Sequence, residues 1–176
     1  MKVIFLYGPP GVGKFTIGNE LSLKTGLPLF HNHLVVDMLY VLFQFGSTGF
    51  KTLRESIWFN IFEVSAKEKK SFIFTFCPEN TVDPKMITRL ESVVEKHDGK
   101  IFFIELTADY ATLAERIDNQ ERAKFGKLTD LPLFKELTDQ GVFTSFDMPK
   151  PFLTIDATHT PIENASKIID ALKSYL

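Results

Sequence analysis

A glycine-rich turn between two regular segments constrains the fold of this chain most strongly. Residues 3–7 (Val-Ile-Phe-Leu-Tyr) are continuously apolar, as in a strand buried on both faces of a parallel sheet. Residues 8–14 read Gly-Pro-Pro-Gly-Val-Gly-Lys, and residues 15–24 have the pattern of a helix that Gly26 ends. The order strand, turn, helix predicts the first unit of an α/β fold.

The remainder of the chain continues this alternation. We expect further strands at 28–33, 71–77, 100–106 and 151–155. Helices are expected at 34–70 with a break at 45–49, from Asp83 and Pro84 to about 97, at 109–117, at 131–140, and after the capping box Thr160-Pro161-Ile162-Glu163. These elements predict a three-layer α/β/α sandwich around a five-stranded parallel sheet with right-handed crossovers.

Length, charge and cysteine content limit the class of protein. A chain of 176 residues is expected to form one domain spanning 1–176. The formal net charge of −2 argues against a nucleic-acid partner, and no apolar run is long enough to span a membrane. With Cys77 as the single cysteine, a cytoplasmic location is expected.

The glycine-rich turn has the residues needed to bind phosphate. Glycines allow positive φ, which brings successive backbone N–H groups around an anion at a helix N-terminus. The lysine adds a full positive charge for the β- and γ-phosphates. In this strand and helix context the pattern predicts a P-loop that binds ATP, with a turn that binds nothing as the alternative. The predicted nucleotide-binding residues are Gly8, Pro9, Pro10, Gly11, Val12, Gly13, Lys14, Phe15 and Thr16.

One position departs from this pattern. Phe15 stands where a serine or threonine usually offers its hydroxyl to Mg²⁺. The run Gly-Pro-Pro-Gly-x-Gly-Lys-x-Thr resembles the loop of adenylate-kinase-like enzymes, in which glycine commonly fills this slot. Mg²⁺ remains an expected cofactor, because it binds largely through phosphates and water. Which protein residues hold the metal is left open.

With this loop and order of elements, the chain resembles the P-loop kinases of nucleosides and small metabolites, including shikimate and gluconate kinases. The resemblance implies an acceptor site at the end of the second strand and in the helical region at about 34–70. It therefore suggests His31, His33 and Arg54 as substrate-binding residues. Shikimate kinase carries a pair of aspartates here, whereas this chain has His-Asn-His, so shikimate itself is not indicated.

The two histidines and Asp37 allow more than one interpretation. If they lie on one strand, His31 and His33 point to the same face, where they could bind a hydroxylated acceptor or provide a general base. A structural role and a metal site are the alternatives. Asp37 is predicted to orient the acceptor hydroxyl or a Mg²⁺-bound water, and the alternative is an exposed carboxylate in the first helical turn.

The third strand lacks the aspartate with which related kinases often end it. Thr75 stands near that location, and Glu79 and Asp83 follow it as possible substitutes. Cys77 is interpreted as a small core residue rather than a nucleophile, because no recognisable pattern places a base beside it.

The segment at about 118–131 resembles the lid loop of these kinases. Arg116 and Arg122 are predicted to stabilise the charge of the transferred phosphoryl group, and Lys124 and Lys127 lie in the same segment. Surface salt bridges are the alternative for all four. Residues 156–161 resemble the family's loop beside the adenine ring.

The sequence therefore predicts a phosphotransferase that moves the γ-phosphoryl group of ATP to a hydroxyl of a small molecule. A nucleoside-monophosphate kinase is one alternative, although four arginines are few for clamping two sets of phosphates. A nucleotide-binding regulatory module without turnover is the other. The acceptor and the oligomeric state stay open at this point.

Overall fold

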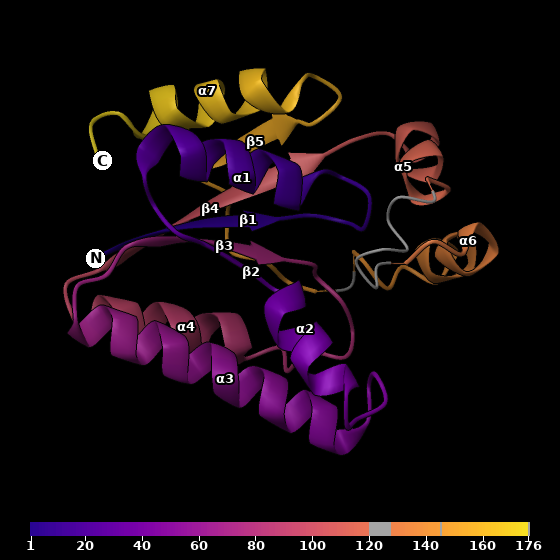
Figure 1. The fold of residues 1–176 in the computed structure, drawn as a ribbon, viewed down its shortest axis with the longest axis horizontal. Helices are drawn as coiled ribbons and strands as arrows, with labels where there is room; N and C mark the ends of the chain where they lie inside the picture. The colour runs from indigo at the N-terminus through magenta and orange to yellow at the C-terminus, as the bar shows by residue number, and fades with distance from the viewer. Residues whose placement is uncertain (120–127, 145, 176) are drawn as a thin grey trace.

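The computed structural model describes residues 1–119, 128–144 and 146–175, and these form an α/β fold around one parallel sheet (Figure 1). Its strands are β1 (Lys2–Tyr7), β2 (Leu29–His31), β3 (Phe72–Phe76), β4 (Lys100–Thr107) and β5 (Leu153–Asp156). Their order across the sheet is β2-β3-β1-β4-β5, and every pairing is parallel. The predicted five-stranded parallel sheet is confirmed.

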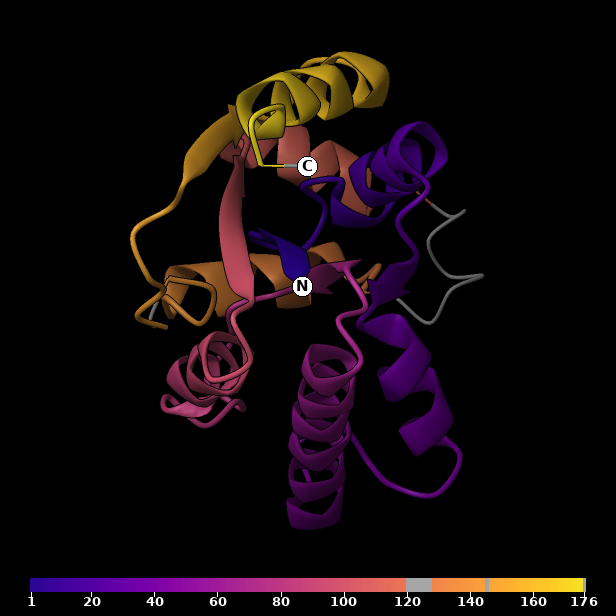
Figure 2. The same ribbon diagram turned by 90° about the vertical axis from the view of Figure 1, so that its left-hand side faces the viewer.

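Helices cover both faces of the sheet. Figures 1 and 2 show α1 and α7 on one face and α2, α3 and α4 on the other, with α5 and α6 beyond the end of β4. The helices are α1 (Lys14–Thr25), α2 (His33–Tyr40), α3 (Thr48–Lys67), α4 (Met86–Glu95), α5 (Tyr110–Ile117), α6 (Leu131–Asp139) and α7 (Pro161–Leu172). The three layers follow the predicted arrangement.

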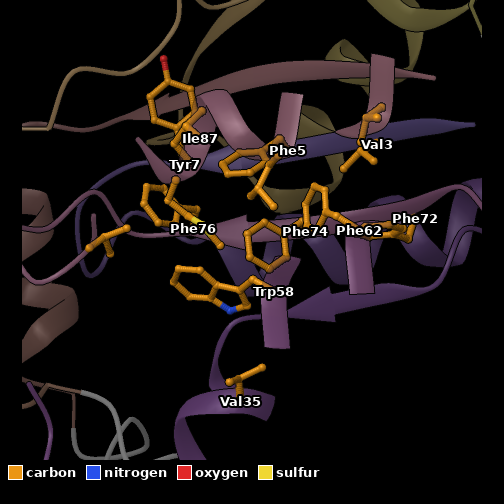
Figure 3. Packing of buried hydrophobic residues seen from close by; sticks show 14 of the residues in the cluster. Val3, Phe5, Tyr7, Val35, Trp58, Phe62, Phe72, Phe74, Phe76 and Ile87 are labelled. Atoms are coloured by element: carbon orange, nitrogen blue, oxygen red, sulfur yellow. The ribbon is translucent and has the colours of Figure 1, made fainter. Parts of the chain in front are cut away.

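Strand β1 lies at the centre of the sheet and contributes to two cores. Val3, Phe5 and Tyr7 pack with α2, α3 and α4, whereas Ile4 and Leu6 pack with α1, α5, α6 and α7. The first core is rich in aromatic rings: Phe5 lies 5.1 Å from Phe74 between ring centroids, within the cluster that Figure 3 shows. Burial of both faces explains why β1 is apolar without alternation. It also fixes the position at which the glycine-rich turn begins.

Strand β2 is shorter than predicted. It ends at His31, and His33 is already the first residue of α2. The backbone N–H of Asn32 donates to the Thr75 hydroxyl at 3.1 Å instead of continuing the ladder. The premise that His31 and His33 share one strand face is therefore wrong.

Two helix boundaries also differ from the predictions. The break between α2 and α3 covers 41–47, earlier than expected, and the Ser47 side chain caps α3 by accepting from the Phe50 N–H at 3.3 Å. Helix α4 begins at Met86 rather than Pro84, because Asp83 Oδ1 accepts from the Lys85 N–H at 2.9 Å in a turn that precedes the helix. The capping box at the start of α7 is confirmed. Within the described ranges, no helix is both long and apolar enough to cross a membrane.

Candidate functional site

A cavity of about 800 Å³ lies at the carboxyl end of the sheet. The turn after β1, the start of α1, the ends of β2 and β3, and helices α2 and α6 all contribute to its wall. This edge of a parallel α/β sheet is where such folds usually bind ligands. The predicted nucleotide-binding residues that line it are Pro10, Gly11, Val12, Gly13, Lys14, Phe15 and Thr16.

The turn after β1 requires glycine at several positions. Gly8, Gly11 and Gly13 have φ values of 150°, 84° and 99°, which L side chains rarely adopt. A Cβ atom on Gly8 would lie 2.4 Å from the carbonyl oxygen of Leu106, in the neighbouring β4. Gly13 also precedes the first residue of α1, so the open end of that helix faces the turn. The local geometry is that of an anion-binding loop.

Lys14 carries the positive charge of this turn. Its Nζ donates to the carbonyl oxygens of Gly8 and Pro9, at 2.7 and 2.8 Å. The ammonium group is thereby folded over the turn that its own helix follows. Its position places a cation at the base of the cavity.

Phe15 and His31 pack against each other at the start of α1. Their ring centroids are 4.9 Å apart with an interplanar angle of 84°. Both His31 and His33 line the cavity even though one ends β2 and the other begins α2. Within the described ranges, no group of three His, Cys, Asp or Glu side chains is arranged to hold a metal ion.

Asp37 lies apart from the cavity wall. Its carboxylate pairs with His33 on the next turn of α2, with Oδ1 3.7 Å from Nδ1, and its side chain is half-exposed. It is not among the described lining residues. The structure therefore connects Asp37 to the cavity through His33.

Arg54 takes a position different from the one predicted for a substrate-binding residue. Its side chain is fully buried in α3, and its guanidinium lies over the Trp58 ring at 5.0 Å. Nη1 donates to Glu79 Oε1 at 2.7 Å, and Nη2 donates to the carbonyl oxygen of Thr81 at 2.9 Å. Arg54 is absent from the described cavity wall, which Glu79 lines instead. The structure thus corrects the expected direct contact: Arg54 positions Glu79.

Glu79 brings a carboxylate to the cavity just beyond the end of β3. Burial raises the pKa of the Glu79 carboxyl, while the positive charges of Arg54 and Lys14 and the hydrogen bonds from Thr81 and Arg54 act in the opposite direction. Of the three residues considered for the missing strand aspartate, Thr75 also lines the cavity. Asp83 is exposed and caps the turn before α4.

Cys77 also lines the cavity, where its thiol could in principle act as a nucleophile if it were ionised. Burial raises its pKa to about 11, with Glu79 acting in the same direction and Lys14 and Arg54 opposing. A nucleophilic cysteine requires a lowered pKa. The environment therefore agrees with the interpretation of Cys77 as a packing residue.

Arg116, at the end of α5, lies beside the glycine-rich turn after β1. Nη2 donates to the carbonyl oxygen of Ala157 at 2.9 Å, and Nη1 donates to that of Val12 at 3.4 Å. The guanidinium lines the cavity. The other predicted lid cations, Arg122, Lys124 and Lys127, lie outside the described residues.

Several wall residues were not predicted from the sequence. They are apolar or aromatic side chains from α2, the segment after it, α6 and the segment after α6: Val36, Tyr40, Phe45, Leu133, Leu137 and Phe143. Tyr40 and Phe45 stack with ring centroids 6.1 Å apart. In the sequence these residues have the spacing of ordinary core positions, so no local signal marks them. Ala157, His159 and Pro161 complete the wall in the segment predicted to lie beside the nucleotide base.

Comparison with known proteins relates this geometry to one class of fold. No protein-family profile matches the chain, and the comparison with curated proteins gives no match. Among solved structures, a candidate kinase from Chloroflexus aurantiacus is 19% identical with a TM-score of 0.74, over 99% of this chain and 98% of that one. The APS kinase of Mycobacterium tuberculosis, in complex with AMPPNP and APS, is 15% identical with a TM-score of 0.65, over 98% and 97%.

Shikimate kinase from Aquifex aeolicus is likewise similar, with 16% identity and a TM-score of 0.58 over 99% of this chain and 97% of that one. The similarity extends across the whole of each chain, and the strand order 2-3-1-4-5 is shared. At these identities the comparison establishes the architecture. The chain has the fold of the P-loop small-molecule kinases.

Proposed function

We propose that this protein is a phosphotransferase that moves the γ-phosphoryl group of ATP to a hydroxyl group of a small molecule. The observation that carries this proposal is the turn Gly8 to Lys14, which has three glycines at positive φ and an ammonium group folded over it. This turn opens into a cavity large enough for a nucleotide and a small second molecule.

The phosphates of ATP would be held by the backbone N–H groups of the turn and by Lys14. Arg116 lies close enough to turn from the carbonyl oxygens of Val12 and Ala157 toward a phosphate. A guanidinium in that place stabilises the charge that spreads over the transferred group. Arg122 remains proposed for the same task on the basis of the sequence.

Mg²⁺, when bound, would neutralise part of the phosphate charge. Phe15 offers no oxygen, whereas the Thr16 hydroxyl belongs to a side chain of the cavity wall. Glu79 provides a carboxylate on the same wall, and the positive charge of Lys14 acts to lower the pKa of that carboxyl. These two residues are the groups that fit around a metal held mainly by phosphate and water.

The acceptor would bind between the phosphate turn and the ends of β2 and β3. In the transfer step the acceptor oxygen forms a bond to the γ-phosphorus, the bond from that phosphorus to the β,γ-bridging oxygen breaks, and ADP leaves with the electron pair. The hydroxyl proton passes to a base. Glu79 is the proposed base, because it brings a carboxylate to the cavity wall just beyond the end of β3, and burial raises the pKa of that carboxyl. His31 and His33 are proposed to contact the acceptor.

The two alternatives have different support. A nucleoside-monophosphate kinase needs arginines for a second set of phosphates, but Arg54 is bound to Glu79 and Arg89 stacks on Phe59 at 5.0 Å, so only Arg116 of the described arginines lines the cavity. A binding module without turnover is suggested by Phe15, and Glu79 argues against it by supplying a carboxylate near the end of β3.

The test is acceptor-dependent formation of ADP from Mg-ATP, measured across a panel of hydroxylated compounds and nucleoside monophosphates. Lys14→Ala serves as the control for contaminating kinases. Release confined to the wild type establishes a kinase. If Mg-ATP stabilises the wild type against heat through ligand linkage but no acceptor stimulates release, the binding module takes precedence.

A further inference from the structure

We infer that the acceptor of this site is an alcohol with an apolar or aromatic body and no negative charge. This inference rests on the proposed phosphotransferase function and adds the chemical class of its second substrate. It concerns the acceptor half of the cavity, defined here as the lining residues His31, Asn32, His33, Val36, Tyr40, Phe45, Thr75, Cys77 and Glu79.

The charge of the acceptor half disfavours anions. Among the described lining residues, the only Lys or Arg side chains are Lys14, which ends the phosphate turn, and Arg116, which lies beside that turn at the end of α5. Arg54, the cation behind the acceptor half, is bound to Glu79 at 2.7 Å and lies 3.8 Å from Glu55. One guanidinium thus faces two carboxylates, which leaves this cluster with net negative charge. A carboxylate or phosphate on the acceptor would be repelled.

Two polar atoms of the acceptor half are placed to accept a hydrogen bond from a ligand, Oε2 of Glu79 and Oδ1 of Asn32. Within the described part of the chain, the hydrogen bonds that reach the Glu79 carboxylate come from Arg54 and Thr81, and both end on Oε1, which leaves Oε2 for a ligand. Asn32 Oδ1 is buried without a hydrogen-bond partner among the described atoms. A buried acceptor of this kind is stabilised by a donor. A hydroxyl group supplies such a donor, and a carboxylate does not.

The remaining wall favours an apolar body. Val36, Tyr40 and Phe45 line one side, and Tyr40 and Phe45 remain 46% and 40% exposed. Rings that stay exposed beside a cavity contribute binding energy when a ligand covers them. A polyol such as gluconate would leave this surface without a complementary partner.

The experiment compares matched pairs of alcohols that differ by one carboxylate. One pair is 4-methylbenzyl alcohol and 4-(hydroxymethyl)benzoate, and further pairs are built on cyclohexylmethanol and on a phenyl glycoside. Binding is measured by ligand-observed NMR in the presence of Mg-AMPPNP, which avoids any dependence on turnover. We expect the neutral member of each pair to bind at least about 10-fold more tightly, a factor typical of one uncompensated charge near a carboxylate.

Two variants check that charge in the cavity causes this preference. Tyr40→Lys adds a cation to the wall and should reduce the ratio within each pair to about 3-fold or less. Leu42→Lys adds the same charge two residues further along, on a side chain that is 81% exposed and is not a described wall residue, and should leave the ratio unchanged.

Each result decides the inference. We expect the wild type to bind the neutral alcohol of each pair more tightly. Tyr40→Lys should reduce this preference, and Leu42→Lys should leave it unchanged. Equal binding, tighter binding of the carboxylates, or no binding of any neutral member at millimolar concentration overturns the acceptor class. As long as Mg-AMPPNP binds, those results do not affect the proposal that the glycine-rich turn binds phosphates. Failure of the wild type to bind Mg-AMPPNP overturns the proposed function itself.

Discussion

Arg54 and Glu79, 25 positions apart, form a buried ion pair with Nη1 2.7 Å from Oε1. The pair connects the first half of α3 to the segment after β3 and holds a carboxylate at the cavity wall. Removing one member of such a pair leaves the other charge buried without compensation. The pair therefore supports both the fold and this side of the cavity wall.

Arg54→Met keeps much of the side-chain volume and removes the charge. We expect the free energy of unfolding to fall by about 3–5 kcal/mol at pH 8, since Glu79 stays buried as an unpaired carboxylate. Adding Glu79→Gln to this variant should recover part of the loss. A double-mutant cycle from denaturant unfolding at pH 8 gives this coupling, and independent effects of the two substitutions would contradict it.

The same variant should show a distinct pH dependence. Burial is the largest cause that raises the pKa of Glu79, and Arg54 opposes it, so removing Arg54 raises that pKa further. A folded-state pKa above the unfolded value means that the folded state binds more protons, and stability falls as pH rises through this window. Arg54→Met should therefore be less destabilised at pH 5 than at pH 8. A deficit that is equal at both pH values would contradict the assigned cause.

Gly8→Ala tests the shape of the phosphate turn. Its Cβ would lie 2.4 Å from the backbone oxygen of Leu106 at a φ of 150°, so we expect about 2–3 kcal/mol of destabilisation and at least about 10-fold weaker binding of Mg-ATP. Gly26→Ala is the matched control, because Gly26 also has positive φ, but apart from its chain neighbours no described atom lies within 4 Å of the added Cβ. It should lose about 1 kcal/mol and keep its nucleotide affinity. Unfolding and calorimetric titration measure both quantities.

Phe15→Thr restores a hydroxyl at the position where P-loops usually hold Mg²⁺. The ring of Phe15 is 36% exposed and packs edge-on against His31, so the smaller side chain is tolerated. We expect the Mg²⁺ concentration that half-saturates nucleotide binding to fall several-fold. An unchanged Mg²⁺ requirement would show that the metal lies away from this residue.

Cys77 should react slowly with alkylating reagents. With its pKa raised to about 11, only about one thiol in a thousand is ionised at pH 8, so iodoacetamide should modify it about 100-fold more slowly than free cysteine. The rate should keep rising up to pH 10. Unfolded protein, with Cys77 as its single cysteine, provides the reference rate. A rate that levels off near pH 9 in the folded protein would contradict the raised pKa.

Local sequence patterns were sufficient to predict the sheet and the glycine-rich turn after β1. The apolar run of β1, the glycines of the turn and the capping box of α7 each depend on neighbours in the sequence. The end of β2 was not predictable in this way, because it depends on a hydrogen bond from Asn32 to Thr75, 43 positions away. The pairing of Arg54 with Glu79 was not predictable for the same reason, because it joins residues 25 positions apart. An arginine in a sequence carries no sign of whether its charge faces a ligand or a buried carboxylate.

The aromatic wall of the cavity was hidden for a related reason. Tyr40 and Phe45 are residue types that are common in protein cores. They lie beside the cavity because α2 packs against the segment that follows it. The acceptor class inferred from these side chains therefore needed the tertiary structure.

Calorimetric titration of Mg-AMPPNP into the wild type and Lys14→Ala tests the central claim, that the turn after β1 binds the phosphates of a nucleoside triphosphate. Lys24→Ala, an exposed substitution in the last turn of the same helix, is the control. We predict saturable binding to the wild type and Lys24→Ala, and at least about 100-fold weaker binding to Lys14→Ala with its fold retained. Equal affinity in all three proteins would contradict the assignment of the turn.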